Sequence, residues 1–125
     1  MSSVTFFKTP LEFRNWLDDN YNKESVLWVG FYKKASKIQS ITLPEAVQQA
    51  LCFGWIDGLI NSIDDISYKI RFTPRRKNSK WSKVNVNYMD KLIKEGKVHS
   101  SGLEAFRHCN RDKAYSVSEQ CKSIE

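Results

Sequence analysis

The sequence predicts one small α+β domain. Helix-start signatures and short runs of β-branched and aromatic residues both occur along the chain, so neither an all-helical nor an all-strand fold fits. The length of 125 residues suits one domain. Seven Phe, five Tyr and four Trp supply a large apolar surface for its core.

Two helix starts carry strong capping signals. Thr9 is placed to cap a helix, Pro10 suits the first helical position and Glu12 completes a capping box. The same signature returns at Thr42-Leu-Pro-Glu45, and Gly54 is placed to end that second helix.

A third helix is predicted from a cap at Ser79 to Glu95, and a short fourth helix opens at Ser101-Gly-Leu-Glu104. At 100° per residue one face of the third helix is apolar and the opposite face is basic. The predicted apolar face carries Trp81, Val84, Asn85, Tyr88 and Leu92, and the basic face Lys80, Lys83, Lys91 and Lys94.

Three strands are predicted. Residues 25–32 are apolar at both alternating sets, so this strand is either covered on both faces or central in the sheet. Residues 59–63 and 66–73 form a hairpin around Asp64-Asp65. In the second hairpin strand, Tyr68, Ile70 and Phe72 face one way, and Lys69, Arg71 and Thr73 face the other.

We expect residues 1–106 to form the domain and residues 107–125 a loosely ordered polar tail. The sequence contains no secretory signal and no apolar run long enough to span a bilayer, which predicts a cytoplasmic protein without membrane insertion. Three widely spaced cysteines, Cys52, Cys109 and Cys121, are expected to be reduced thiols. Their spacing to the two histidines matches no metal motif, and no nucleotide or catalytic fingerprint is present, so we expect no metal, no cofactor and no familiar catalytic residues.

Positive charge is concentrated in one window. The whole chain has a net charge of +6, but residues 69–97 carry ten basic and two acidic residues, a net of +8, and the rest of the chain therefore has a net charge of −2. Such asymmetry indicates either an anionic partner or a solvated basic face.

The best candidate site lies where the last predicted strand gives way to the third helix. Arginine forks bind phosphate and carboxylate with paired hydrogen bonds, and helix N-termini attract anions. The alternative is that Arg75 and Arg76 pair internally with Asp57, Asp64 or Asp65. The candidate ligand-binding residues are Asp57, Trp55, Arg71, Arg75, Arg76, Ser79, Lys80, Trp81, Ser82 and Lys83.

Several motifs together resemble the bacterial YdeI/OmpD-associated family, also called bacteriocin-protection proteins. They include Cys52-Phe-Gly-Trp-Ile-Asp-Gly58, residues 68–76, Ser79-Lys-Trp-Ser82 and Trp28-Val-Gly-Phe-Tyr-Lys-Lys34. The resemblance covers roughly residues 6–107. It implies a YjbR/CyaY-like fold, in which a two-layer arrangement packs an antiparallel sheet of a few strands against about four helices. It also implies tolerance to bacteriocins, without a mechanism or catalytic residues.

Three functions remain open at this point. The first is a non-enzymatic binding module for an anionic ligand or nucleic acid, which uses Arg71, Arg75, Arg76, Lys80 and Lys83. The second is a stress-tolerance protein that meets a protein partner through an exposed patch around Trp55 or Trp81. The third is an enzyme whose site pairs Asp57 with Arg71.

Overall fold

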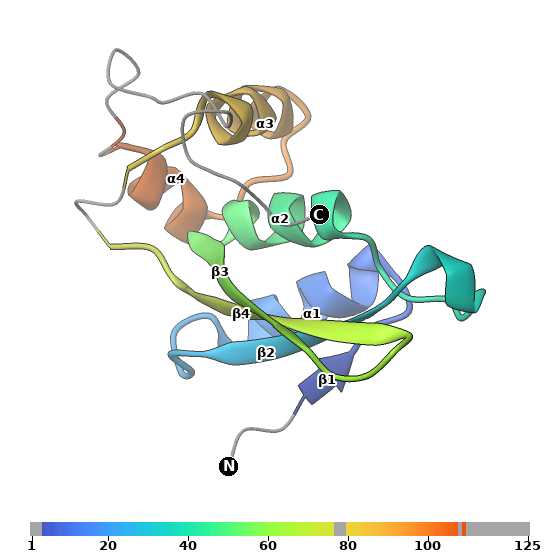
Figure 1. The fold of residues 1–125 in the computed structure, drawn as a ribbon. Helices are drawn as coiled ribbons and strands as arrows, with labels where there is room; N and C mark the ends of the chain where they lie inside the picture. The colour runs from blue at the N-terminus through green and yellow to red at the C-terminus, as the bar shows by residue number, and fades with distance from the viewer. Residues whose placement is uncertain (1–3, 77–79, 108, 110–125) are drawn as a thin grey trace.

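A computed structural model of the chain describes residues 4–76, 80–107 and 109 (Figure 1). The predicted two-layer α+β architecture is confirmed, because four helices pack against a four-stranded sheet. In chain order the elements are β1 (Val4–Phe6), α1 (Pro10–Asn20), β2 (Leu27–Tyr32), the 3-10 turn η1 (Lys34–Ser36), α2 (Leu43–Cys52), β3 (Trp55–Ser62), β4 (Ser67–Pro74), α3 (Lys83–Lys94) and α4 (Ser100–Arg107).

The strand order is β1-β2-β4-β3, which makes the sheet mixed and not wholly antiparallel. β1 pairs in parallel with β2, because α1 carries the chain back across the sheet between them. The other two pairs are antiparallel. β1 was not predicted from the sequence, since three residues are too few to show a strand period.

β2 is central, as expected, but only one of its faces is covered. Leu27, Val29 and Phe31 are buried in the main core, whereas Trp28 and Tyr32 are only half-buried on the other face. The alternative of two covered faces is therefore wrong. The apolar residues of both faces predicted the strand correctly, but they could not reveal that all the helices lie on one side.

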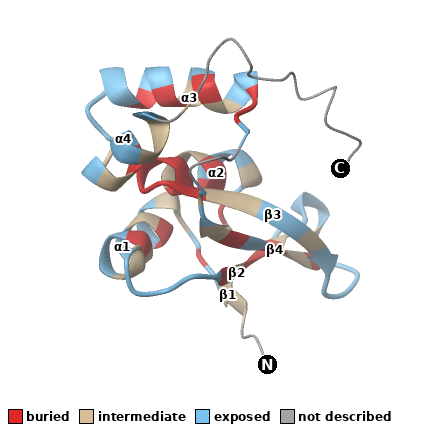
Figure 2. Cartoon of the chain, turned by 90° about the vertical axis from the view of Figure 1, so that its left-hand side faces the viewer, coloured by how far each residue is buried: buried red, intermediate tan, exposed pale blue. Residues whose placement is uncertain are grey.

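Both predicted caps form, but only one of the two predicted capping boxes does. The Thr9 hydroxyl oxygen accepts from the Glu12 N–H at 3.3 Å, whereas the Glu12 carboxylate accepts from the Lys8 N–H at 2.8 Å and so does not close the box. Thr42 and Glu45 exchange both bonds of a capping box. α1 and α2 lie over the same face of the sheet. α2 in turn contacts α1, α3, α4 and β3, so α3 forms an outer layer whose buried side faces α2 (Figure 2).

α3 begins later than predicted, and its buried face is different. Its cap is Ser82, whose hydroxyl oxygen accepts from Asn85 N–H at 3.1 Å; the predicted cap Ser79 lies outside the described residues. Val86 and Met89 are buried, while Val84 is 42 % exposed. The predicted face was counted from Trp81, which precedes the helix and so does not follow the helical period.

The hairpin turn is confirmed, with Asp64 Oδ1 accepting from the Ile66 N–H and from the Ser67 hydroxyl at 3.0 and 2.8 Å. β3 begins earlier than predicted, because residues 55–58 also belong to it. A bulge follows Asp57, where the register with β4 shifts.

α4 packs tightly against the end of α2. A Cβ on Gly102 would lie 2.3 Å from the Cys52 carbonyl oxygen, so only glycine permits this approach. Of the predicted tail, residues 110–125 lie outside the described part of the chain. No helix among the described residues has both the length and the apolar character needed to cross a membrane.

Candidate functional site

The basic cluster predicted at the end of β4 is divided between two environments. Arg71 is exposed in the middle of the strand, whereas Arg75, just past its end, is half-buried. The two arginines therefore lie in different environments.

Arg75 holds the segment before α3 against the end of the sheet. Its guanidinium carbon lies 3.8 Å from the centre of the Trp81 ring, a close cation–π contact. Its Nη2 donates to the Lys80 carbonyl oxygen at 2.8 Å, and its backbone N–H donates to the Gly54 carbonyl oxygen at 2.8 Å. These contacts give Arg75 a structural role.

Both tryptophans around which the protein-partner hypothesis requires an exposed patch are buried. Trp55 is 1 % exposed, packs edge-on against Trp16 and donates its Nε1–H to the Tyr21 carbonyl oxygen at 3.3 Å. Trp81 is 4 % exposed, between Arg75 and Phe106. The prediction of an exposed docking patch around Trp55 or Trp81 was therefore wrong, because large aromatic rings in a small domain are usually buried in the core.

Asp57 and Arg71 do not form a site. Asp57 is opposite Phe72 in the register, so Arg71, one residue earlier, points to the other face of the sheet. Burial raises the pKa of Asp57 above its ordinary value of 3.8, and the nearby positive charge of Arg75 opposes this rise. The predicted pairing of Asp57 with Arg71 is therefore wrong, because the two side chains lie on opposite faces of the sheet.

The predicted site residues at the start of α3 lie in two environments. Ser82 is 5 % exposed, and its hydroxyl oxygen already caps the helix. Arg76, Lys80 and Lys83 are exposed. Ser79 and Lys77 lie outside the described residues.

A different set of residues comes together on the face of the sheet opposite the described helices. We call this set the open face. It is built on the two central strands, where Trp28 pairs with Arg71, Gly30 with Lys69 and Tyr32 with Ser67. The open face consists of Phe6, Trp28, Gly30, Tyr32, Lys69 and Arg71.

Lys69 and Trp28 are in direct contact across the two central strands. The ammonium nitrogen of Lys69 lies 4.7 Å from the centre of the Trp28 ring. Arg71 is exposed beside the same tryptophan. Two cations thus flank one aromatic ring in the middle of the sheet.

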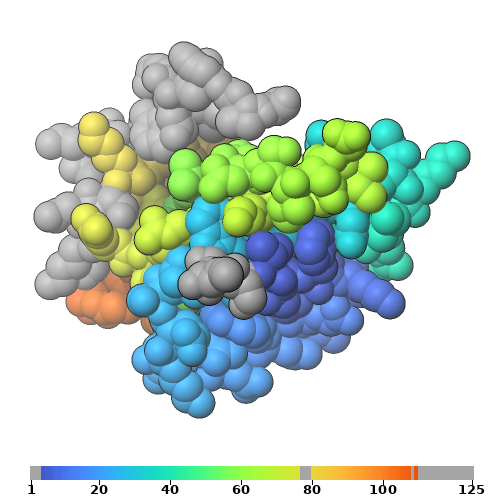
Figure 3. Space-filling model, turned by 60° about the horizontal axis from the view of Figure 1, so that its bottom comes forward, coloured from blue at the N-terminus to red at the C-terminus, as the bar shows by residue number. Residues whose placement is uncertain are grey.

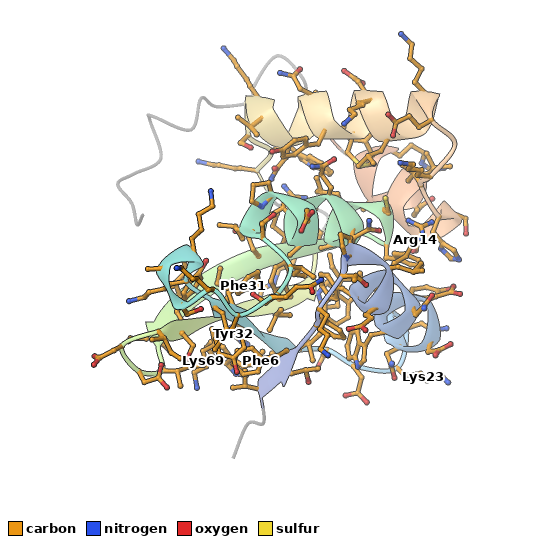
Figure 4. The ribbon with its side chains drawn as sticks, turned by 90° about the vertical axis from the view of Figure 1, so that its right-hand side faces the viewer. Phe6, Arg14, Lys23, Phe31, Tyr32 and Lys69 are labelled. Carbon is orange, nitrogen blue, oxygen red and sulfur yellow. The ribbon has the colours of Figure 1, made fainter. Side chains whose placement is uncertain are left out.

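Phe6 joins the open face from β1. Its ring lies over Gly30, where a Cβ would be only 2.5 Å from the ring carbons, and it stacks on Tyr32 with ring centres 4.6 Å apart. Phe6 remains 38 % exposed. Figure 4 shows Phe6, Tyr32 and Lys69 close together below the sheet, with Phe31 on the helix side. Gly30 provides the space that this ring needs.

The open face is positively charged. Asp57 is the one acidic residue of the four described strands, and it points to the opposite side. Within the described part of the chain, neither Lys69 nor Arg71 forms an ion pair. In Figure 3, which looks at the molecule from the side away from α2 and α3, β3 and β4 run along the surface in green and yellow.

Sequence reasoning found Arg71 but missed the aromatic part of this site. The signal was present as a period of two, with Trp28, Gly30 and Tyr32 alternating with the core residues of β2. Phe6 had no such signal, because its strand was too short to recognise.

A second aromatic cluster surrounds His99 at the start of α4. The imidazole lies against Phe53 and Tyr21, with ring centres 4.9 and 4.8 Å away. Its Nδ1 accepts from the Ser101 N–H at 3.1 Å, and the Ser101 hydroxyl donates to the Phe53 carbonyl oxygen at 3.0 Å. The ring acts as a cap for α4 and is satisfied within the fold. Among the described residues, no three His, Cys, Asp or Glu side chains gather to hold a metal.

Comparison with protein families corrects the resemblance drawn from the motifs. Residues 5–105 match the model of a family described as a Domain of unknown function (DUF8412), and nothing points to the YdeI/OmpD-associated family. The expected bacteriocin-protection role therefore loses its basis. No curated protein and no solved structure matches the chain. Since the matching model covers most of its length, the chain belongs to the family described as Domain of unknown function (DUF8412).

Proposed function

We propose that this domain is a binding module for single-stranded nucleic acid, and that the nucleic acid binds to the open face. The observation that carries the proposal is that partly exposed aromatic rings lie beside Lys69 and Arg71, two cations that form no ion pair with any described residue. Unstacked bases bind to aromatic side chains on sheets, and lysine and arginine neutralise the phosphates between them.

The charge of the open face favours nucleic acid over a protein segment. Its cations Lys69 and Arg71 have no acidic neighbour on this side of the strands. A hydrophobic protein partner would have to bury both cations, which is unfavourable without matching carboxylates. A strand of phosphates supplies the opposite charge at every nucleotide.

The exposed rings favour single strands over duplexes. In a duplex the bases are stacked within the helix and leave only groove edges and phosphates to a flat sheet. In a single strand each base can turn onto an aromatic ring, and each such stack contributes about 1–3 kcal/mol. Trp28 and the stacked pair of Phe6 and Tyr32 offer two such platforms.

The test is a fluorescence anisotropy titration with labelled single-stranded DNA and RNA of about ten nucleotides, within the range of single-strand site sizes. We expect both to bind at low salt, and Trp28→Ala to weaken binding about five- to a hundred-fold. Lys69→Ala with Arg71→Ala should also weaken binding and should reduce the salt slope by about 1.4, since each phosphate contact contributes about 0.7.

A matched control separates the open face from general positive charge. Lys91→Ala with Lys94→Ala removes the same two charges from the exposed side of α3, where both residues are solvent-exposed. We expect this variant to keep nearly full affinity. Equal losses in the two double variants would reject the open face as the site, and absence of binding by the unaltered protein would reject the function. Self-association abolished by Trp28→Ala, without nucleic-acid binding, would assign the face to a protein partner instead.

A further inference from the structure

We infer that two copies of this chain pair through residues 59–63, at the end of β3, so that their sheets join edge to edge. We call these residues the free edge. The pairing does not depend on the proposed function, since it uses the rim of the sheet and not the open face. Three features of the molecule point to it: unpaired backbone groups, side chains that match a second copy of themselves, and the distance of the nearest cations.

The backbone of the free edge directs hydrogen-bonding groups away from the sheet. Among the described strands β3 has one neighbour, β4. The Ile63 N–H donates to the Ser67 carbonyl oxygen at 3.1 Å, and the backbone groups of successive residues in a strand point to alternate sides. The N–H and C=O groups of Ile60 and Ser62 therefore point away from β4, and no described strand pairs with them. Such a row of groups is a template for another strand.

The free edge lacks the features that usually prevent strand pairing. Sheet edges are commonly protected by charged side chains, prolines or bulges. The bulge after Asp57 interrupts the first half of β3, but residues 59–63 contain neither a charge nor a proline. Leu59 is 60 % exposed and Ile63 is 41 % exposed. Unpaired backbone and exposed apolar side chains thus coincide on one short segment.

The sequence of the free edge is complementary to itself. In an antiparallel pair centred on Asn61, the outward backbone groups of Ile60 meet those of Ser62 of the second copy. Asn61 then faces its own equivalent at a position where side chains approach closely, and an amide supplies both donor and acceptor. Leu59 faces Ile63 of the second copy, so the exposed apolar side chains cover each other. This twofold match favours a second copy over an unrelated strand.

The cations of the open face do not oppose the pairing. Lys69 lies opposite Asn61 on β4, so the two Lys69 residues of a pair are three strand spacings apart, about 14 Å. This distance exceeds the Debye length of about 8 Å at physiological ionic strength. The twofold axis of the pair is perpendicular to the sheet, and both open faces therefore lie on the same side of the joined sheet.

The pairing ends at two copies. A symmetric contact uses the same segment on both chains and leaves neither segment available to a third. The opposite edge of the sheet is β1, whose three residues are too short to extend the array. A closed dimer is therefore expected, and not a fibre.

Sedimentation velocity of the full chain at increasing protein concentration, without nucleic acid, tests the pairing. We expect the mass to rise from that of one chain to twice that value. Ser62→Pro should hold it at one chain, because proline removes an outward N–H and leaves the bonds to β4 intact. Asn61→Lys should do the same, since like charges directly opposite each other are destabilising. The control Asn87→Lys adds the same charge on the exposed side of α3 and should keep the dimer.

Amide hydrogen exchange locates the interface. The N–H groups of Ile60 and Ser62 should be protected in concentrated protein and should exchange rapidly in dilute protein. Protection already present in the monomer would mean that the chain covers its own edge, and a dimer without this protection would place the interface elsewhere; either result overturns the inference. So would a protein that stays monomeric at every concentration, or a dimer that persists in Asn61→Lys and Ser62→Pro variants shown by thermal unfolding to be folded.

Discussion

Arg71 and Arg75 are four residues apart at the C-terminal end of the hairpin, and the fold uses them in opposite ways. Arg71 projects from the open face into solvent, whereas Arg75 lies against Trp81 and donates to the Lys80 carbonyl oxygen. The difference comes from what surrounds each position. The middle of the sheet has helices on one side only, while its end meets α2, α3 and α4. We call these regions the open middle and the packed end.

The largest expected difference in unfolding free energy is between variants on the two faces of β4. Phe72 is fully buried in the main core, and Phe72→Ala should lower the free energy of unfolding by about 3–5 kcal/mol. Lys69→Ala, on the open face of the same strand, removes the cation–π contact with Trp28 and should lower it by no more than about 1 kcal/mol. Urea denaturation of both variants measures the difference. Equal losses would mean that the open face is covered in the folded protein.

Two glycines test the same contrast with one added methyl group each. At Gly102 the methyl group would meet the Cys52 carbonyl oxygen at 2.3 Å, and the rigid backbone cannot move away. Gly102→Ala should therefore destabilise the protein by about 1–3 kcal/mol. At Gly30 the obstacle is the exposed ring of Phe6, which can rotate aside. Gly30→Ala should lower the midpoint of thermal unfolding clearly less than Gly102→Ala does, and a reversed order would contradict the assignment of the two regions.

The arginines themselves provide a third contrast. Arg75→Ala loses a partly desolvated cation–π contact and a hydrogen bond from a charged group, an expected loss of about 1–3 kcal/mol. Arg71→Ala should leave the unfolding free energy nearly unchanged and should weaken oligonucleotide binding. Chemical denaturation and anisotropy titrations on the same samples check both effects. Binding lost in Arg75→Ala but kept in Arg71→Ala would reverse the roles assigned here.

The smallest effects are expected in the pH dependence of stability, where two aspartates should act in opposite directions. Burial raises the pKa of Asp57 above 3.8 in the folded state, so its ionisation destabilises the fold as pH rises through that folded pKa. Asp57→Asn should thus gain stability relative to the unaltered protein between about pH 3 and neutrality.

Asp64 has its pKa lowered, chiefly by the hydrogen bond from the Ser67 hydroxyl and then by the Ile66 N–H. Its stabilising contribution is complete above pH 3.8 and is lost as pH falls through the folded pKa. Asp64→Asn should therefore lose stability relative to the unaltered protein as pH rises to 3.8 and show no further change above that pH. Thermal unfolding at a series of pH values distinguishes the two slopes, and slopes of the same sign would contradict one of the two environments.

The parts of the fold that were predicted correctly depend on neighbours in the sequence. The caps at Thr9 and Thr42 form within four residues of chain, and the Asp64 turn within three. The alternation along β4 was also predicted correctly, because side chains of a strand must point to opposite faces. By contrast, β1 and the buried face of α3 were missed, since both depend on pairing or packing with distant residues.

The candidate site followed the same division. The sequence by itself determined that positive charge gathers in residues 69–97 and that Lys69 and Arg71 share one side of a strand. Only the tertiary structure decided which cations stay in water and which aromatic rings lie beside them. Trp28 and Trp81 have the same side chain, yet Trp28 is half-buried on the open face beside Lys69 and Trp81 is buried against Arg75. The physical reason is that burial depends on which elements pack together, and that is set by contacts between residues far apart in the chain.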